Sequence, residues 1–556
     1  MPDTNAPHES KPRRWHRQIV ERFVITGILR LETPAHFGNG ETDTLTDMPL
    51  LRDELDGSPL LPGTSIVGAL RNYLRERELG DCAPPPLPPK DKTEKEEARF
   101  QAELARERKL AAGRLFGGAR GDDEGSQSPL IVHDALGRAT DYELRDGVRI
   151  EPETRTAEDE KKYDITLLAA GSTFDLRFDL LIGLPDGCKD LASEACRAKF
   201  DAERAGLLKA LTAALDGFAK GEVTLGARKR RGFGRCRVDE WEVKHYDLRT
   251  RTGLLAWLAE GRGDWVAPVE TKNAVTLAEA LGLDGEPLSD ARKRFTLIAS
   301  FAIDGSLMVR SGLADSGPDM IHLHSPRPEQ NGGMKPRPIF AGTSWAGVLR
   351  SRATQIAYTI APSEKGGKQD DKVAQLIGGI FGPAEIKSRK QPKKDKSAEE
   401  TKQTEVEPKA SRIEIRETEV QGGRLLDQTR IKIDRFTGGA FESALFSEQP
   451  LFGNKDSRLK LELSLRLPAE LSRDRQQAEI GLLLLLLKDL WTGDLPLGGE
   501  VGVGRGRLQG VNAEINYDGH TWRLSQADNG AITVAEGDRA ELQRFVEMLR
   551  EELRYA

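Results

Sequence analysis

The sequence is poor in the residues from which disulfide scaffolds and zinc sites are built. Its 556 residues include four cysteines, Cys82, Cys188, Cys196 and Cys236, and no two of them form a CxxC pair. This spacing argues against a disulfide framework and a cysteine-rich zinc site, and it favours a reducing cytoplasm. The eight histidines form no HExxH motif, so the sequence contains no zinc motif.

Long apolar runs are missing as well. The longest run, Ile480 to Leu487, is ended by Lys488 and Asp489, and it is too short to span a bilayer. The first 17 residues are polar and lack the apolar core of a signal peptide. The sequence therefore predicts a cytoplasmic protein with no membrane partner.

The chain also lacks an excess of positive charge. It has 83 Lys and Arg against 89 Asp and Glu, which gives a formal net charge of −6. Proteins that bind nucleic acid through their overall charge are usually strongly basic. Any surface for nucleic acid must therefore be local.

An internal repeat is present and decides the architecture. The segment RFVITGILRLETPAHFGNG, starting at Arg22, resembles RFTLIASFAIDGSLMVRSG, starting at Arg294, so the two copies begin 272 residues apart. The same offset places Asp47-Met48 on Asp319-Met320. Four further pairs recur in the same order: PGTSIVGALR at Pro62 and AGTSWAGVLR at Ala341, LFG at Leu115 and IFG at Ile380, VRIEPETRTA at Val148 and IKIDRFTGGA at Ile431, GFGRCR at Gly232 and GVGRGR at Gly502.

Each half is predicted to be an α+β module with the strand–helix–strand, strand–helix–strand order of a ferredoxin-like (RRM-like) fold. The GTSxxGxLR blocks are expected to open the first helix, and the second helix is expected at Ala205–Phe218 and Gln477–Trp491. Hydroxyl residues are the expected N-caps of the first helix: Thr64 or Ser65, and Thr343 or Ser344.

The predicted domains follow from these repeats and from changes in composition. They are a flexible N-terminal tail at 1–20, a first module at 21–248, a linker at 249–290, a second module at 291–525 and a C-terminal helix at 526–556. An insertion at about 82–110 begins with prolines and continues as a charged helix. A second insertion, at about 384–412, is nearly all charged or polar and is expected to be flexible.

Two repeated motifs have the chemistry of phosphate binding. The loop Gly226–Arg237 places cations among glycines, and glycine lets a backbone approach a phosphate closely. The helix start of each GTSxxGxLR block offers hydroxyls and backbone N–H groups to an anion. The alternatives are a tight turn with exposed arginines and a capped helix with packing glycines. The candidate RNA-binding residues are Ser65, Arg71, Arg228, Lys229, Arg230, Arg231, Arg235, Ser344, Arg350, Arg505 and Arg507.

Together these blocks resemble the RAMP superfamily of CRISPR-associated proteins, and more closely the repeated backbone subunit of type III effector complexes. Two fused modules resemble type III-D-like systems. The resemblance implies a palm that holds CRISPR RNA and a β-hairpin thumb that displaces one nucleotide of the guide–target duplex. The thumbs would be Val148–Ile165 and Arg430–Phe446, where Arg149 and Lys432 occupy matching positions and are expected to contact RNA.

The resemblance also implies an activity and partners. A loop aspartate would cleave complementary target RNA, and the matching residues are Asp47 and Asp319. Either carboxylate could take a proton from a 2′-hydroxyl or hold Mg²⁺, which needs few protein ligands beside phosphate oxygens. The expected partners are CRISPR RNA, target RNA, further RAMP backbone subunits and the large subunit of the complex.

Three other interpretations stay open. Asp47 and Asp319 can be ordinary loop residues, which would leave a non-catalytic RNA-binding backbone subunit. A nuclease that processes CRISPR RNA would need a histidine near the first helix; His36 is the candidate, but Met308 replaces it in the second module. His322 and His324 could assist acid–base chemistry, although alternate histidines are more often structural.

Overall fold

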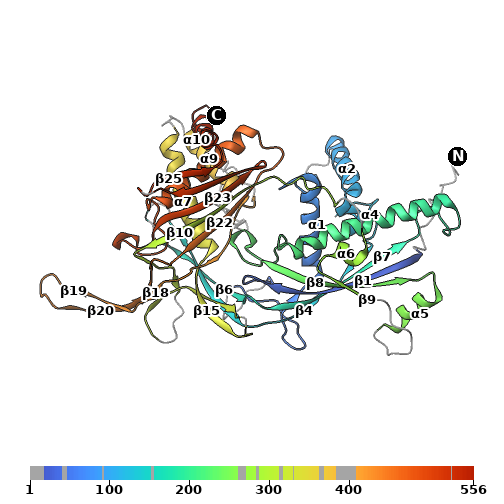
Figure 1. Ribbon diagram of the computed structural model, residues 1–556, viewed down its shortest axis with the longest axis horizontal. Coiled ribbons are helices and arrows are strands. Elements are labelled where there is room, and N and C mark those ends of the chain that lie inside the picture. The colour runs from blue at the N-terminus through green and yellow to red at the C-terminus, as the bar shows by residue number, and fades with distance from the viewer. Residues whose placement is uncertain are drawn as a thin grey trace, which may run out of the picture.

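The computed structural model describes residues 18–40, 47–89, 93–119, 121–151, 154, 156–260, 271–283, 287–311, 317–329, 331–361, 368–383, 409–527 and 529–555. Within these ranges the chain forms two lobes, each a mixed α/β unit in which helices cover an antiparallel sheet (Figure 1). The lobes correspond to the two copies of the repeat, and we call them the first and second modules.

The first module is built around β1 (Ile19–Leu31), which pairs with β7 (Thr173–Gly183) and β8 (Cys236–Asp247). Phe23, Ile25 and Leu29 of β1 contribute to its hydrophobic core. The outer strands are β3 (Leu130–Val132), β4 (Ala135–Arg138) and β2 (Leu60–Leu61) on the β7 side, and β9 (Thr271–Ala274) on the β8 side. The helices are α1 (Gly63–Leu79), α2 (Glu94–Lys109), α3 (Ala111–Phe116) and α4 (Glu194–Ala219).

The second module repeats this plan. Its central strand, β10 (Arg294–Asp304), pairs with β22 (Leu459–Arg466) and β23 (Arg507–Tyr517). The outer strands are β16 (Ile413–Ile415) beside β22, and β24 (His520–Gln526) and β25 (Ile532–Glu536) beyond β23. The helices are α7 (Gly342–Ile360), α8 (Lys368–Phe381), α9 (Arg473–Trp491) and α10 (Arg539–Tyr555). The predicted second helices are confirmed as α4 and α9.

The predicted N-caps are wrong. Pro62 and Ala341 occupy the N-cap positions of α1 and α7, and neither makes a side-chain cap hydrogen bond. The backbone N–H of Gly63 donates instead to Asp134 Oδ1 at 2.6 Å, a partner that the local sequence does not reveal. The hydroxyl residues expected at the caps therefore lie in the first helical turn: Thr64, Ser65, Thr343 and Ser344.

Two predicted segments contain more structure than expected. The linker 249–290 contains α5 (Arg251–Ala259), β9 and α6 (Leu277–Leu281), and Leu277 and Ala280 are buried in the core of the first module. The C-terminal segment 526–556 adds β25 to the second sheet before the predicted helix, α10. Residues 1–17 and 384–408, which fall in the predicted tail and second insertion, lie outside the described residues.

The two predicted thumbs are antiparallel hairpins. β5 (Tyr142–Ile150) pairs with β6 (Ala157–Leu168), and β19 (Gln428–Ile433) pairs with β20 (Ala440–Gln449). The β5–β6 hairpin lies between the modules, whereas β19–β20 projects from the second module at the far left of Figure 1. Short strands complete the second module: β11 (Ser306–Leu307), β12 (Arg310–Ser311), β13 (Met320–His322), β14 (His324–Pro328), β15 (Met334–Phe340), β17 (Thr418–Glu419), β18 (Arg424–Leu425) and β21 (Leu451–Phe452).

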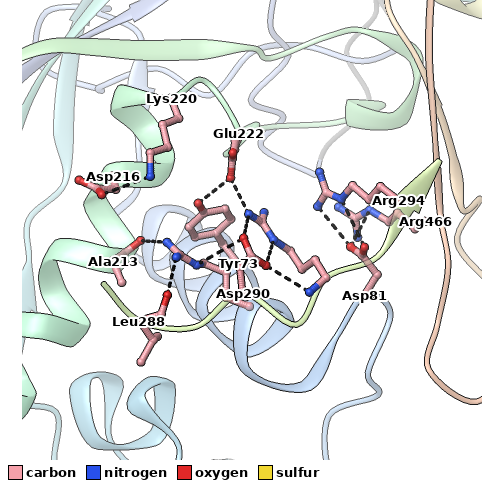
Figure 2. Close-up of polar contacts among 12 residues, drawn as sticks. Tyr73, Asp81, Ala213, Asp216, Lys220, Glu222, Leu288, Asp290, Arg294 and Arg466 are labelled. Atoms are coloured by element: carbon pink, nitrogen blue, oxygen red, sulfur yellow. Dashed lines mark hydrogen bonds and ion pairs between the residues drawn. The ribbon is translucent and has the colours of Figure 1, made fainter. Parts of the chain in front are cut away.

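Ion pairs near the C-terminal end of α1 join the two modules. The buried carboxylate of Asp81, just after α1, accepts hydrogen bonds from Arg294 of β10 at 3.2 and 3.3 Å, and Arg466 of β22 lies 3.8 Å away (Figure 2). Arg466 also contacts Glu76 of α1 at 2.6 Å. Both arginines belong to the second sheet, so these contacts fix the second module against the first helix of the first module.

The structure corrects the expectation about cysteines in one place. Cys188 and Cys196, in the segment before and at the start of α4, form a disulfide, whereas Cys82 and Cys236 are free thiols. Their spacing of eight residues brings them together because the chain turns into α4 between them. In the part of the chain that the structure describes, no helix has both the length and the apolarity needed to cross a membrane.

Candidate nucleic-acid interface

Asp47 and Asp319 make the same hydrogen bond to a hairpin strand in the two modules. Asp47 Oδ2 accepts a hydrogen bond of 2.9 Å from the backbone N–H of Asp164 in β6. Asp319 Oδ2 accepts one of 2.7 Å from the backbone N–H of Ser447 in β20. The next residue, Met48 or Met320, bridges the same hairpin strand in parallel, and both aspartates are exposed. Each carboxylate therefore ties its loop to the base of a hairpin.

The surroundings of the two aspartates differ in charge. Near Asp47, Asp146 and Asp164 face each other across the β5–β6 hairpin. Burial raises the pKa of Asp164, and the charges of Asp146 and Asp47 raise it further. Asp319 has Ser447 in place of Asp164.

Neither aspartate lies in a metal site made by protein alone. Among the described residues, no group of three or more His, Cys, Asp or Glu side chains is placed to hold a metal ion. The carboxylates fit only a sparse Mg²⁺ site in which phosphate oxygens supply the remaining ligands.

The structure aligns the two glycine loops at a different residue offset from the one that the sequence motifs suggested. In the first module, Arg228 and Gly232 have left-handed backbones and flank the 3₁₀ turn η1 (Lys229–Arg231). In the second, Glu500 and Gly504 flank η2 (Val501–Val503) in the same way. The loops are thus equivalent at the offset of 272 found for the strands, two residues from the GFGRCR–GVGRGR match. The basic turn of the first module corresponds to an apolar turn in the second.

The basic turn η1 lies at the junction of the modules. Gly232, directly after it, packs against the backbone of Arg416 and Glu417, with no room for a side-chain carbon. Gly342, the first residue of α7, is packed equally closely against the carbonyl of Arg231. The loop predicted as an open phosphate cradle is therefore held between the modules, and both glycines are needed for close backbone approach.

This packing brings together two arginines that have no counter-ion among the described residues. We call Arg231 of η1 and Arg350 of α7 the junction arginines. Neither has an ion pair or a side-chain hydrogen bond among the described residues, and Arg231 Nη1 is buried without a partner. Burial, and then the charges of Arg350 and Arg230, lower the pKa of Arg231 to about 10. Burial and Arg149 lower the pKa of Arg350.

Arg71, at the position equivalent to Arg350, has hydrogen-bond partners for its guanidinium. Its guanidinium donates to the carbonyls of Gly117 at 3.1 Å and Gly118 at 3.3 Å. Arg71 therefore clamps the loop after α3, and its predicted contact with RNA stays a prediction. On the same helix faces, Ser65 is exposed, Ser344 is partly exposed, and nothing described lies within 4 Å of a side-chain carbon placed at Gly68 or Gly347.

The second glycine loop offers less to RNA than expected. Arg505 is buried and is paired with Glu448 and with Glu500 at 3.0 Å, which corrects its prediction as an RNA contact. Glu448 and Glu500 neutralise the charge of Arg505, and Glu500 occupies the position that Arg228 has in the first loop. Arg507 is half exposed and lies 4.0 Å from Asp304.

Other predicted contacts are distributed around the first loop and the hairpins. Arg235 pairs with Glu32 at 3.1 Å, and Arg228 stacks on Tyr163 of β6 and bonds to its hydroxyl. Lys229 is exposed, and Arg230, like Arg231, has a buried Nη1 without a partner. On the hairpins, Arg149 pairs with Glu158 at 2.9 Å and Lys432 lies over the Phe441 ring at 4.7 Å.

Of the histidines named in the sequence, His36 and His322 are buried and His324 is partly buried. His36 Nδ1 lies 2.8 Å from the Thr166 carbonyl, and its ring is 2% exposed. His322 is fully buried between the N–H of Val309 and the carbonyl of Ile339. His324 Nδ1 bonds to the carbonyl of His322 at 2.6 Å. Such partners leave little access for substrate, so neither acid–base interpretation gains support.

His322 predicts acid sensitivity of the second module. Burial, and then the neighbouring His324, lower the pKa of His322 from 6.5 to about 4. Between these two pH values, His322 is protonated in the unfolded chain but neutral in the folded protein. The free energy of unfolding therefore falls as the pH drops from about 6.5 towards 4, by about 2 kcal/mol at pH 5. Thermal unfolding at pH 7.5 and 5 should show a smaller pH effect in His322→Gln than in the wild type. Equal pH effects in both proteins would contradict this.

Sequence reasoning missed the buried network that anchors the first hairpin to the second module. Arg145 of β5 binds Glu143 and, across the junction, Glu417, which also accepts a hydrogen bond from Arg327. Burial raises the pKa of Glu143; for Glu417, Arg145 and Arg327 outweigh burial and lower the pKa. Charged residues on a strand with alternating polarity are normally predicted to face solvent. No signal in the sequence indicated that Glu143 and Arg145 are buried.

Comparison with known proteins agrees with the two-module plan. A sequence model described as the RAMP superfamily matches residues 28–237 and 327–509, one stretch in each module and together more than half of the chain. The matched stretches contain Asp47, both glycine turns, both GTSxxGxLR helices and both hairpins. No curated protein matches the chain.

Proposed function

The chain belongs to the RAMP superfamily, and from this premise we propose that it is a CRISPR RNA-binding backbone subunit of a type III effector complex. Proteins of this family typically bind CRISPR RNA within multi-subunit complexes. The fusion of two modules favours a type III-D-like system. The proposed partners are CRISPR RNA, its complementary target RNA, further RAMP backbone subunits and the large subunit, in the cytoplasm.

We interpret each module as a ferredoxin-like unit carrying a thumb. The strand orders support this, because β8-β1-β7-β3 and β23-β10-β22-β16 both follow the order fourth–first–third–second of a strand–helix–strand, strand–helix–strand unit. The hairpins β5–β6 and β19–β20 leave their modules before the third of these strands, β7 and β22. Such insertions suit the proposed thumbs.

The observation that carries RNA binding is the charge of the junction arginines, which no acidic residue in the described part of the chain neutralises. Like charges that are partly buried without counter-ions destabilise a folded protein unless an anion binds there. A phosphate offers guanidinium groups two charge-assisted hydrogen bonds and removes this cost. The exposed Ser65 and the partly exposed Ser344, with open space at Gly68 and Gly347, give a nucleic-acid backbone room to approach.

We further propose that the chain is a metal-dependent endoribonuclease through Asp47 and Asp319. Each carboxylate keeps Oδ1 without a described partner while Oδ2 holds the base of the thumb. The group can thus face an RNA strand that the thumb distorts and accept the proton of a 2′-hydroxyl. Mg²⁺, when bound with phosphate oxygens, would stabilise the charge that develops on the phosphate. The alternative is a non-catalytic backbone subunit in which these aspartates only fix the hairpins.

Arg350→Gln tests the RNA-binding proposal. Removing this unpaired charge should weaken CRISPR RNA binding by about 1–3 kcal/mol and lower the slope of log affinity against log salt by about 1. Without RNA, the same change should leave thermal stability unchanged or raise it, because one like-charge repulsion disappears. Fluorescence anisotropy with a labelled CRISPR RNA over a salt series, together with thermal unfolding, measures both effects.

Arg71→Gln is the matched control from the other copy of the motif. Arg71 already holds two carbonyls, so its loss should lower stability and change the salt slope little. If Arg350→Gln binds RNA with the wild-type affinity and salt slope, the junction arginines do not contact phosphates. If it is also destabilised like Arg71→Gln, the unpaired-charge argument is wrong.

A further inference from the structure

A pocket lies at the base of the second hairpin. Its volume of about 480 Å³ is typical of small-molecule sites. His324, Arg337 and Pro338 line it from β14 and β15, and Glu419 and Leu425 line it from β17 and β18. Because β18 precedes the hairpin and pairs with β21 behind it, the pocket lies where β19–β20 leaves the module (Figure 1).

Backbone pairing identifies the residues of the first module that correspond to the lining of this pocket. The corresponding pairs are Arg52–Pro59 with His324–Pro338, Tyr142–Leu168 with Leu425–Leu451, and Leu60–Leu136 with Ile339–Glu419. Arg52 therefore corresponds to His324, and Tyr142 corresponds to Leu425. Both correspondences agree with the repeat offsets of the aspartate loops and the hairpins.

In the first module, a stacked pair of side chains occupies the corresponding place. The guanidinium carbon of Arg52 lies 4.5 Å from the centre of the Tyr142 ring. Arg52 Nη1 also donates to the Tyr142 hydroxyl at 2.8 Å and to the Gly57 carbonyl at 3.1 Å. The second module has a smaller ring, His324, and an aliphatic side chain, Leu425. It therefore leaves open the space in which the first module stacks a flat group on an aromatic ring.

The second module also adds charged groups to this place. Glu419 stands where the first module has Leu136. Arg337 Nε lies 3.7 Å from Glu419 Oε1, and its Nη2 reaches Glu329 at 3.4 Å, so both of these contacts are long. The side chains of Arg337 and Glu419 are 39% and 41% exposed. The carboxylate can therefore accept N–H donors from a ligand while the guanidinium donates to its acceptors.

His324 gives the pocket a flat, uncharged wall. Its Nδ1 lies 2.6 Å from the His322 carbonyl, which can only accept, so Nδ1 carries the proton. Burial lowers the pKa of His324, which keeps the ring neutral at neutral pH. Histidine is among the side chains on which unstacked bases of RNA are held. The pocket thus combines a stacking surface with a donor and an acceptor of opposite charge.

We propose that this pocket binds a nucleobase, and guanine in preference to the other bases. Guanine places two N–H donors on one edge beside the acceptors O6 and N7, which suits a carboxylate next to a guanidinium. Each of the other bases offers a carboxylate only a single donor group. The base can belong to a free guanine nucleotide or to an unpaired nucleotide of RNA, and the second source rests on the proposed function. The junction arginines take no part in this pocket.

Photo-crosslinking with 6-thioguanosine tests the proposal and separates the two sources. The full-length chain is irradiated with 6-thioguanosine monophosphate, or with a short single-stranded RNA that contains a single 6-thioguanosine, and crosslinked peptides are identified by mass spectrometry. The expected peptides contain His324 or residues 419–425. Labelling by the free nucleotide identifies a nucleotide site, and labelling by the RNA alone identifies a site for a base within a strand. Unlabelled GMP should compete about tenfold better than AMP, CMP or UMP.

Arg350→Gln separates a failure of this proposal from a failure of the proposed function. This variant should weaken labelling by the RNA probe but leave labelling by the free nucleotide unchanged. No labelling of the pocket peptides by either probe, or equal competition by all four nucleotides, would overturn the nucleobase pocket whatever the effect of Arg350→Gln.

His324→Arg combined with Leu425→Tyr rebuilds the stacked pair of the first module inside the pocket. Labelling by whichever probe marks the wild type should fall about tenfold or more, because the rebuilt pair takes the place of the base. The mirror change in the first module, Arg52→His with Tyr142→Leu, is the matched control and should leave this labelling unchanged. Thermal unfolding checks that each variant is folded.

Glu419→Gln gives a second measurement at a partly exposed side chain whose replacement leaves the fold intact. The preference for GMP over AMP in the competition should fall about tenfold, because an amide cannot accept both donors of guanine as a carboxylate does. Wild-type labelling of the rebuilt pocket, or an unchanged base preference in Glu419→Gln, would contradict the proposal.

Discussion

Asp47→Asn combined with Asp319→Asn is expected to abolish target-RNA cleavage while leaving guide binding and folding intact. Asparagine keeps an oxygen in place of Oδ2, so it can still accept the N–H of Asp164 or Ser447 and hold the hairpin base. It cannot take a proton or hold Mg²⁺ as a carboxylate does. Loss of a positioned general base costs about 10²–10⁴-fold in rate. Cleavage of a labelled target by the assembled complex with Mg²⁺ measures this.

Alanine substitutions separate the two roles of these aspartates. Asp47→Ala loses both the carboxylate and the acceptor, so the loop and the hairpin should also become more mobile, seen as faster amide exchange at Asp164. If the asparagine double variant cleaves like the wild type and only alanine is defective, the aspartates are structural. The chain would then be the non-catalytic backbone subunit. The single variants show whether Asp47, with Asp146 and Asp164 beside it, does more than Asp319.

Much of the architecture was accessible from the sequence because duplication supplies an internal comparison. The offset of 272 residues placed Asp47-Met48 on Asp319-Met320, and the structure gives both pairs the same contacts with a hairpin strand. The hairpins and the second helices were also found, since alternating and helical patterns are local. Such features depend on residues near one another in the chain, which is what a pattern can reveal.

The register of the glycine loops could not be found in this way. Glycines alternate with other residues at Gly232 and Gly234 in the first loop and at Gly502, Gly504 and Gly506 in the second, so the first pair fits the second loop at two offsets. Only the left-handed residues Arg228 and Glu500 fix the correct one. That correction turned Arg505 from an RNA contact into the partner of Glu448, at the position of the buried Phe233. Burial by a distant segment leaves no local trace.

Arg145→Met is expected to destabilise the protein by about 3–5 kcal/mol, the cost of leaving buried carboxylates without their cation. Arg145 and both its partners, Glu143 and Glu417, are buried. Because Glu417 belongs to the second module, the loss should also uncouple the modules. Calorimetry should then show two separate unfolding transitions for the variant, whereas the modules of the wild type should unfold in a more strongly coupled way.

Arg138→Met is the control for this change, since its pair with Asp175 is exposed on both sides and should be worth less than about 1 kcal/mol. Glu143→Gln added to Arg145→Met should recover part of the stability, because one of the two stranded carboxylates is neutralised. A single transition at the wild-type temperature would mean that Arg327 alone suffices for Glu417. The junction arginines would then be held in place by the backbone contacts of Gly232 and Gly342 rather than by this network, and the hairpin could move without disturbing the RNA-binding surface.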